Sequence, residues 1–466
     1  MISTLNASYN KGYVWLVSVV AAMGGLLFGW DWVVIGGAKP FFQRYFELTG
    51  AAQIGWANSC ALIGCLAGAL AAGALSDKFG RKRLLIIAAL LFAVTSAGNA
   101  LSRDFSVFIA WRIFGGVAIG LASNLSPMYI AEVAPARMRG QLVSINQLTI
   151  VIGILLAQYI NWFLVRNLPA GATDEFIRHS WFGQQGWRWM FGLTAAPALL
   201  FFIGMLLVPE SPRWLAQHGL HERALRILTK IGGAKYADAS LDEIKSTLTP
   251  KEVQRVRFAD LLEPKMRKVL VLGIVLALFQ QWCGINVIFN YAEEIFRVAG
   301  YDISTVLKNI AWTGSVNLVF TLVALAVIDR AGRRPLMLLG SGGLAAIYLA
   351  LGFCYWNGVK GGAMLLLVLA AIGCYAMSLA PVVWVVISEI FPNRIRGAAM
   401  AVAVSALWIG CFTLTFSFPI LNGWLGSAGT FWLYAAVCVA GFLFIQFKLP
   451  ETKGKSLEQL EKELVD

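Results

Sequence analysis

Long apolar runs constrain this chain more than any other feature of its sequence. A helix needs about 20 apolar residues to cross a bilayer. Because the bilayer core holds no water for unpaired backbone groups, each spanning run must close its backbone hydrogen bonds within a helix. Twelve such runs occur, at 13–38, 51–75, 84–102, 105–131, 141–165, 187–208, 267–296, 305–328, 335–357, 362–388, 398–421 and 428–449. With 58% hydrophobic and 14% charged residues, the sequence predicts an all-α membrane protein with twelve transmembrane helices.

The net charge of +13 does not indicate nucleic acid as a partner. The Lys and Arg residues are concentrated in loops that share one side of the membrane if both termini are cytoplasmic, and cytoplasmic loops carry such an excess. No G-x-x-x-x-G-K-[ST] motif for a nucleotide occurs,. The seven cysteines lie inside apolar runs without paired spacing, and the three histidines lie in loops. We therefore expect no metal, no cofactor and no enzyme activity.

The chain contains an internal repeat of six runs plus six. Segments 77–83 and 329–334, which follow the second and eighth runs, both carry Asp, Gly and Arg in that order. Segments 132–140 and 389–397 both carry Glu followed at the same spacing by Arg and Gly. Such a duplication is hard to obtain by chance. It predicts four parts, an N-terminal bundle at 1–208, a cytoplasmic helical linker at 209–266, a C-terminal bundle at 267–449 and a cytoplasmic tail at 450–466.

Four carboxamides lie within the apolar run 267–296, namely Gln280, Gln281, Asn286 and Asn290. In lipid each loses solvation unless it bonds to another polar group or to a polar ligand. At about 100° per residue, Gln281 and Asn286 lie on nearly opposite faces of a straight helix. They share a polar path only if the helix breaks, and we expect the break at Gly284. For any single amide, a purely structural role between helices is the alternative.

Two ionisable residues stand alone in their runs, Asp31 in the first and Arg112 in the fourth. The first run is expected to lead outward and the fourth inward, which places both side chains about 10 Å below the outer surface. A lone buried charge is costly, and pairing is the usual way to bear it. The pair is either a fixed structural ion pair or a site at which Asp31 alternates between pairing with Arg112 and carrying a proton.

The motifs of this chain resemble those of the major facilitator superfamily, and four of them resemble its sugar porter family. These are RxxGGxxxGxxS at 112–123, PESPRWL at 209–215, QQxxGIN at 280–286 and PETKG at 450–454. The resemblance covers essentially the whole chain and is similar in layout to bacterial proton-coupled pentose and hexose symporters and animal facilitative glucose carriers. It implies two pseudo-symmetric six-helix bundles that carry a neutral monosaccharide by alternating access, with the proton as coupling ion.

The resemblance also implies which residues hold the sugar. Carboxamides pair with sugar hydroxyls, and aromatic rings pack on the C–H surface of a sugar. The expected contacts are Gln147, Gln280, Gln281, Asn286, Asn317, Trp384, Phe28 and Trp408. Aromatic residues in membrane helices more often pack or form interfacial belts, and the motif match is what favours Trp384 as a contact. Asp31 and Arg112 match the positions that carry proton coupling.

Three positions depart from the family pattern. Thr194 stands where proton symporters have a carboxylate on the sixth helix, which leaves coupling open. Asn290 replaces the first of two tyrosines, so that Asn290 and Tyr291 are expected to form an altered outer gate. Leu407 before Trp408 replaces a Gln or Asn, which removes one hydrogen-bonding group and alters sugar preference,.

Acidic and basic residues alternate at the helix ends that face the cytoplasm. Exposed ion pairs contribute about 0–1 kcal/mol each, so a network of them biases a two-state equilibrium without locking it. We expect ion pairs between the two halves to form when the protein is open outward and to break when it opens inward. The gating residues expected here are Asp77, Arg81, Glu132, Arg139, Glu210, Asp329, Arg333, Glu389 and Arg396.

The expected protein is therefore a secondary sugar transporter, a proton symporter, embedded in the lipid of a bacterial inner membrane and acting as a monomer. The first alternative is a proton-independent facilitator, in which Asp31 and Arg112 form only a structural pair. The second is a sugar receptor on the same fold that transports nothing. The segment after Lys448 is short for a signalling tail, which disfavours the receptor.

Overall fold

The computed structural model describes residues 9–169, 171–247, 263–298, 300–392 and 396–453. Within these ranges the regular structure is helical, and no strand occurs. Among the described residues, eleven helical stretches are long and apolar enough to cross a membrane, the last covering Ala398–Lys448. That stretch is 51 residues long, about twice the length needed for one crossing. It is interrupted at Gly426, whose φ is 67°, so that it makes two crossings and the twelve predicted runs are all accounted for.

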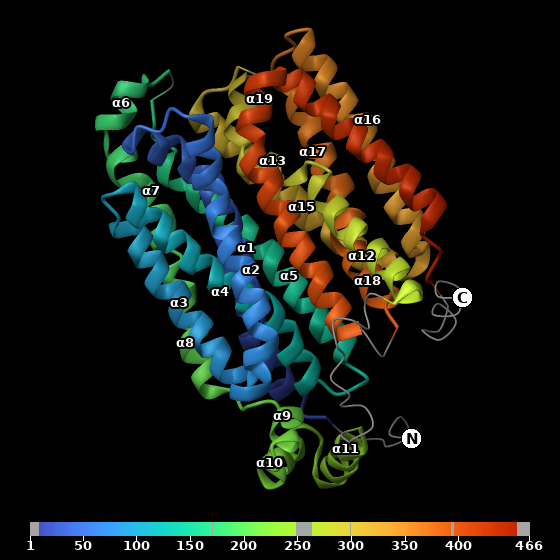
Figure 1. Ribbon diagram of the computed structural model, residues 1–466. Helices are drawn as coiled ribbons and strands as arrows, with labels where there is room; N and C mark the ends of the chain where they lie inside the picture. The colour runs from blue at the N-terminus through green and yellow to red at the C-terminus, as the bar shows by residue number, and fades with distance from the viewer. Residues whose placement is uncertain (1–8, 170, 248–262, 299, 393–395, 454–466) are drawn as a thin grey trace.

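The N-terminal half forms one bundle, at the left of Figure 1. Its first five crossings are α1 (Lys11–Tyr45), α2 (Ala51–Phe79), α3 (Arg81–Leu101), α4 (Phe105–Val133) and α5 (Arg139–Val165). The short α6 (Asp174–His179) follows, and the sixth crossing consists of a π-helical turn, η2 (Phe182–Gly186), then α7 (Trp187–Gly192) and α8 (Ala195–Leu207).

Three short helices gather at one end of the bundles (Figure 1), namely α9 (Pro212–Gln217), α10 (His221–Gly232) and α11 (Ala234–Thr247). We call this end the linker side and the opposite end the far side. The backbone N–H of Asn10 donates to the carbonyl of Ile231 over 2.9 Å, so α1 begins on the linker side. The helical linker predicted at 209–266 contains these three helices, and its residues 248–262 lie outside the described part of the chain.

The C-terminal half repeats this layout at the right of Figure 1. Its helices are α12 (Pro264–Trp282), α13 (Ile285–Asn290), α14 (Ala292–Val298), α15 (Ile303–Ala331), α16 (Arg333–Trp356), α17 (Gly362–Met377), α18 (Leu379–Ile390) and α19 (Arg396–Lys448). The seventh crossing breaks between α12 and α13, and the tenth breaks between α17 and α18 at Ser378, whose φ and ψ are −125° and −89°. Both breaks lie in the interior of the bundle.

The repeat is exact at the turns that join α2 to α3 and α15 to α16. Gly80 has φ 90° and ψ 162°, and Gly332 has φ 91° and ψ 161°. Residues with a side chain rarely adopt this positive φ. In each half, a glutamate at the end of the half binds the start of the helix that follows this glycine. Glu210 accepts the backbone N–H of Arg81 over 3.1 Å, and Glu451 accepts the backbone N–H of Arg333 over 3.0 Å.

The two glutamates differ in their acidity although they do the same work. Burial raises the pKa of Glu210, and this outweighs the backbone N–H groups that oppose it. Burial also acts to raise the pKa of Glu451, but hydrogen bonds from backbone N–H groups, that of Arg333 among them, leave it below its usual value. Each carboxylate compensates orphan N–H groups at a helix start, where the helix dipole favours negative charge.

We predict that Gly80→Ala destabilises the protein by about 1–3 kcal/mol, because an alanine at positive φ is strained and its Cβ would collide with the Glu210 carboxylate,. Thermal unfolding of the purified protein in detergent measures this. The matched control is Gly140→Ala, since Gly140 lies in α5 with open space around it and should gain stability from helix propensity. Equal melting temperatures for the two variants would contradict the assignment.

Candidate functional site

The seventh crossing breaks where the sequence predicted. Gly284 adopts a left-handed conformation with φ 87°, which ends α12 and begins α13. A Cβ on Gly284 would lie 2.8 Å from the ring of Tyr434, so glycine is required both by the backbone angle and by the space. The break turns the carboxamides that follow Gly284 toward those that precede it. The prediction of a break at Gly284 is confirmed.

Gln281 and Asn286 meet across this break. The Nδ2 of Asn286 donates to the Oε1 of Gln281 over 2.5 Å and contacts the Sγ of Cys411 at 3.4 Å. Both amide side chains are buried. In an unbroken helix they would lie on opposite faces, so their contact is a consequence of the break at Gly284.

Gln280 joins the two broken crossings of the C-terminal half. Its Nε2 donates to the carbonyls of Leu379 and Ala380 over 3.1 and 3.2 Å, directly after the break at Ser378. Its Oε1 is buried and has no hydrogen-bond partner among the described residues. A buried acceptor left in this state costs free energy unless a ligand or water donates to it. Gln280 therefore fixes the site and still offers an acceptor to a polar ligand.

Three other predicted sugar contacts come from three further helices. Gln147 lies on α5, Asn317 on α15 and Trp384 on α18. Within the described part of the chain, these three make no hydrogen bond to the amide cluster of α12 and α13. Trp384 is 39% exposed, so its ring is not enclosed in the packed interior. The structure thus brings Gln281 and Asn286 into contact across the break, and it ties Gln280 to the break of the tenth crossing. The remaining predicted contacts lie apart from these three amides.

An aromatic cluster joins the two halves near the middle of α1. The ring centroids of Phe28 and Trp32 are 5.8 Å apart, and each lies 6.1 Å from the ring of Trp408. The indole Nε1 of Trp408 is buried without a partner among the described residues. Phe28 and Trp408 were expected at the site, whereas Trp32 was missed. Its position one turn beyond Phe28 on the same helix face was the available signal.

Asp31 and Arg112 form the predicted pair. The Nη1 of Arg112 donates to both carboxylate oxygens of Asp31, over 3.0 and 2.9 Å. Both side chains are buried, and the guanidinium also lies 5.3 Å from the ring centre of Phe191. The expectation of matching depth is confirmed. The expected end of the first helix is wrong, because α1 continues past Ala38 to Tyr45 through Pro40.

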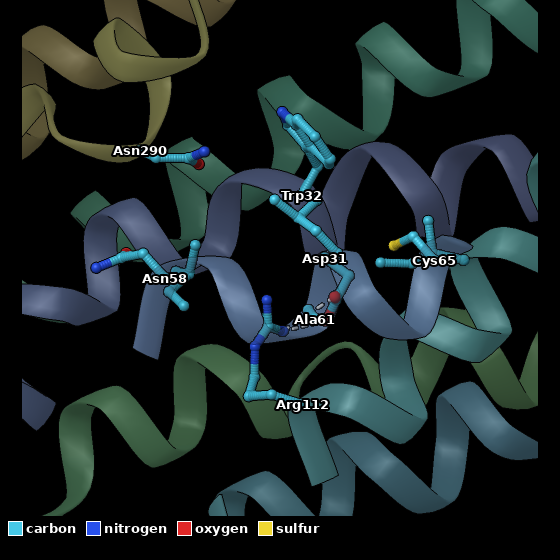
Figure 2. Close-up of a pocket in the computed structure, with 10 residues that line it drawn as sticks. Asp31, Trp32, Asn58, Ala61, Cys65, Arg112 and Asn290 are labelled. Atoms are coloured by element: carbon cyan, nitrogen blue, oxygen red, sulfur yellow. Dashed lines mark hydrogen bonds and ion pairs between the residues drawn. The ribbon is translucent and has the colours of Figure 1, made fainter. Parts of the chain in front are cut away.

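A small cavity of about 10 Å³ adjoins this pair, on the scale of one water molecule. Figure 2 shows Asp31 and Arg112 at its centre, with Trp32, Asn58 and Asn290 among its lining residues. The Oδ1 atoms of Asn58 and Asn290 are buried without partners among the described residues. Asn290 lines this cavity beside the ion pair, and its expected place in the outer gate stays a prediction. Asn58 was not singled out, because an isolated amide on an apolar helix gives no signal of its own.

Tyr291 packs where a gate is expected. It is fully buried, its hydroxyl donates to the carbonyl of Thr415 over 2.7 Å, and its ring lies 4.6 Å from that of Phe418.

Thr194 lies between α7 and α8, buried, with a hydroxyl that has no partner within the described ranges. At this position the sixth crossing therefore carries an uncharged hydroxyl and not a carboxylate.

The predicted gating residues on the linker side pair within each half. Arg81 contacts Asp77 at 3.2 Å and Glu132 at 3.1 Å, and Arg333 contacts Glu389 at 3.2 Å. Arg139 is exposed at the start of α5, and Glu210 holds the start of α3 as described above. The side chains of Asp329 and Arg396 lie outside the described residues. Arg81 and Arg333 are thus each held by carboxylates of their own half. Pairs between the halves were expected in the outward-open state and stay a prediction.

Broken crossings with carboxamides at the breaks, a buried ion pair between Asp31 and Arg112 and a repeat of six crossings plus six are features of a membrane transporter,. The sequence model of the family described as "Sugar (and other) transporter" matches residues 17–464. The chain belongs to this sugar transporter family.

Several known proteins are similar to it. The D-xylose-proton symporter of Escherichia coli (strain K12) is 39% identical, with 98% of this chain and 97% of that protein covered. The arabinose-proton symporter of Bacillus subtilis (strain 168) is 39% identical, with 98% and 96% covered. Among solved structures, the inward-open conformation of the xylose transporter XylE from E. coli has a TM-score of 0.84 at 37% identity, with 97% of this chain and 100% of that chain covered.

We predict that Arg112→Gln destabilises the protein by about 3 kcal/mol, because it leaves the Asp31 carboxylate buried without a counter-ion. The double variant Asp31→Asn with Arg112→Gln should recover most of this loss, since neither charge then remains. Thermal unfolding of the single and double variants in detergent forms a complete mutant cycle. Additive losses in the double variant would show that the two side chains do not depend on each other.

Proposed function

We propose that this protein is a sugar:proton symporter that moves a neutral monosaccharide, a pentose or a hexose, by alternating access. The observation that carries the proposal is the break of the seventh crossing, where Asn286 bonds to Gln281 and the neighbouring Gln280 bonds to the backbone at the break of the tenth crossing. Carboxamides donate and accept at once, which suits neighbouring hydroxyls on one molecule. The similarity to xylose-proton and arabinose-proton symporters supports the same substrate class.

The sugar is held by amides from both halves and by aromatic rings. Gln280, Gln281 and Asn286 supply the central hydrogen bonds, with Gln147 and Asn317 on neighbouring helices. The rings pack against the C–H face of the sugar. We assign this role to Phe28, Trp384 and Trp408, and we add Trp32 because it packs on two of them. Leu407 is buried beside Trp408 and supplies no hydrogen bond, so the site prefers a sugar with no polar group at that edge.

Asp31 and Arg112 couple the sugar to a proton. A proton on Asp31 neutralises the carboxylate that Arg112 now holds, which releases the guanidinium and weakens the contact between α1 and α4. The cavity beside the pair has room for one water molecule that the Asn58 and Asn290 amides can hold,. Such a water would carry the proton to Asp31. Thr194 contributes no charge, so coupling on this proposal rests on Asp31 alone.

We propose that the two bundles, 1–208 and 267–449, rock about the site while the linker at 209–266 and the tail at 450–466 remain cytoplasmic. The contacts between the bundles support this. The hydroxyls of Tyr159 and Ser315 are 3.3 Å apart, and the Nε2 of Gln158 donates to the hydroxyl of Thr313 over 3.4 Å. These contacts between α5 and α15 lie toward the far side. The structure is also more similar to the inward-open XylE structure, with a TM-score of 0.84, than to the XylE structure bound to 6-bromo-6-deoxy-D-glucose, with a TM-score of 0.80. This difference supports a state that is closed on the far side and open on the linker side.

On this proposal the far side is extracellular, both termini are cytoplasmic and the membrane is a bacterial inner membrane, in which the protein acts as a monomer among lipid. Tyr291 and Asn290 belong to the outer gate and its connection to the coupling pair. The linker-side ion pairs of Arg81 and Arg333 hold each half rigid while the two bundles move relative to each other,. A facilitator without coupling is the second candidate, and Thr194 in place of a carboxylate is the observation that favours it.

We predict that Asp31→Asn abolishes proton-driven accumulation of labelled sugar, because the amide cannot carry the proton. Exchange of internal for external sugar across proteoliposomes should persist, since exchange needs no net proton movement. Alkalinisation of a weakly buffered medium on addition of sugar to de-energised cells measures coupling directly. If the parent protein admits sugar with no proton at any pH, the facilitator is the correct function. If Asp31→Asn still accumulates sugar, coupling does not rest on Asp31.

We predict that Asn286→Ala raises the KM for sugar by about 10–100-fold, because one buried donor and acceptor set is worth about 1–3 kcal/mol. Uptake of labelled D-xylose, with a competition panel of pentoses and hexoses, gives the KM and the preferred sugar. Asn357→Ala is the control, since Asn357 is exposed at the end of α16 and bonds only within its own turn. Equal effects of both substitutions would remove Asn286 from the sugar site.

A further inference from the structure

Lys39 is an ionisable residue in the interior that the transport site does not use. It lies on α1, two turns beyond Asp31 toward the far side, and its side chain is fully buried. Its ammonium group lies 4.7 Å from the ring centre of Tyr291. The predicted first run ended at Ala38 and placed Lys39 outside the membrane. A buried lysine is among the rarest of residues and requires a counter-ion.

The counter-ions of Lys39 come from the opposite half. Its Nζ forms an ion pair and hydrogen bond with Glu294 and lies 3.7 Å from Glu293, both on α14. Glu293 is buried as well, and Arg297 on the same helix contacts it at 3.5 Å. By contrast, Arg44 on α1 pairs with Asp174 on α6 over 2.8 Å, within the N-terminal half.

The backbones around this contact are also close. A Cβ on Gly36 would lie 3.4 Å from the Cα of Asn290, so α1 and α13 touch one turn before Lys39 reaches α14. The two halves are therefore closed against each other on the far side at this point. Opening the far side must separate Lys39 from both glutamates, because they move with different bundles.

We propose that Lys39 and Glu293, with Glu294, form the charged gate that closes the far side of the transporter. A contact that exists in one state and not in the other shifts the equilibrium between them by its free energy. In the closed state the ammonium is dry and paired, and in the open state water hydrates all three charges. The gate stabilises the state that is open to the linker side, whereas a pair within one half is present in both states and shifts nothing.

This inference rests on the proposed alternating access but not on the identity of the substrate or on proton coupling. It assigns residues Lys39, Glu293 and Glu294 to the step that follows sugar release. In that step the empty protein reopens to the far side, and the contact must break. Loss of the gate should therefore favour the state open to the far side and raise access from that side.

Access from the far side is measured by labelling a cysteine placed behind the gate. Ile35→Cys suits this because Ile35 is buried and lines the cavity beside Asp31 and Asn290. A membrane-impermeant maleimide is applied to the far side of right-side-out vesicles without sugar, and the parent chain without Ile35→Cys gives the background from native cysteines. With Lys39→Met or Glu293→Gln added, labelling should rise about tenfold or more, since breaking a buried pair is worth several kcal/mol.

The matched control is Arg44→Met, which removes a cation of the same helix end whose partner lies in its own half. It should leave labelling unchanged. Unchanged labelling in Lys39→Met and Glu293→Gln overturns the gate, and so does an equal rise in all three variants, which would indicate general loosening. If Lys39→Met does not fold, Glu293→Gln decides alone. Because no sugar or pH gradient is used, failure of the proposed sugar:proton symport would leave this measurement unaffected.

Discussion

The structure depends on one constraint, that a polar group inside the bilayer must find its partner within the protein. The carboxamides of the seventh crossing reach their partners because helices break at two places, Gly284 and Ser378. Gln280 spans from one break to the other, and the break at Gly284 lets Asn286 reach Gln281. The same breaks leave the Oε1 of Gln280 without a partner among the described residues. A site that binds a polar solute needs such incomplete satisfaction, because a fully bonded network has nothing to offer a ligand.

The internal repeat places equivalent contacts within each half, and these contacts keep each half rigid. Glu210 and Glu451 hold equivalent helix starts, next to glycines with nearly identical backbone angles. Arg81 and Arg333 are likewise held by carboxylates of their own halves. These contacts do not change if the bundles move as rigid bodies. They preserve the shape of each half, which is a precondition for rocking about a central site.

Charge pairs between the halves, unlike those within one half, must break when the bundles separate. Lys39 reaches from α1 to α14 on the far side, where it is buried together with Glu293 and also pairs with the partly exposed Glu294. Asp31 and Arg112 pair inside the N-terminal half, yet Asn290 of the C-terminal half lines the cavity beside them. Closure of the far side therefore places an amide against the coupling pair and a lysine against two glutamates. Both contacts connect the state of the gate with the environment of Asp31.

The sequence by itself determined the twelve crossings, the repeat, the break at Gly284 and the Asp31–Arg112 pair, because each follows from local apolarity, from spacing or from the cost of a lone charge in lipid. It also predicted the chemistry of the amide cluster. Only the tertiary structure decided that Lys39 is buried, since hydropathy falls at Lys39 and Pro40 while the helix continues. It likewise placed Trp32 and Asn58 at the site and kept the linker-side pairs within each half. These outcomes depend on which helices meet, and pairing between distant helices leaves no trace in local composition.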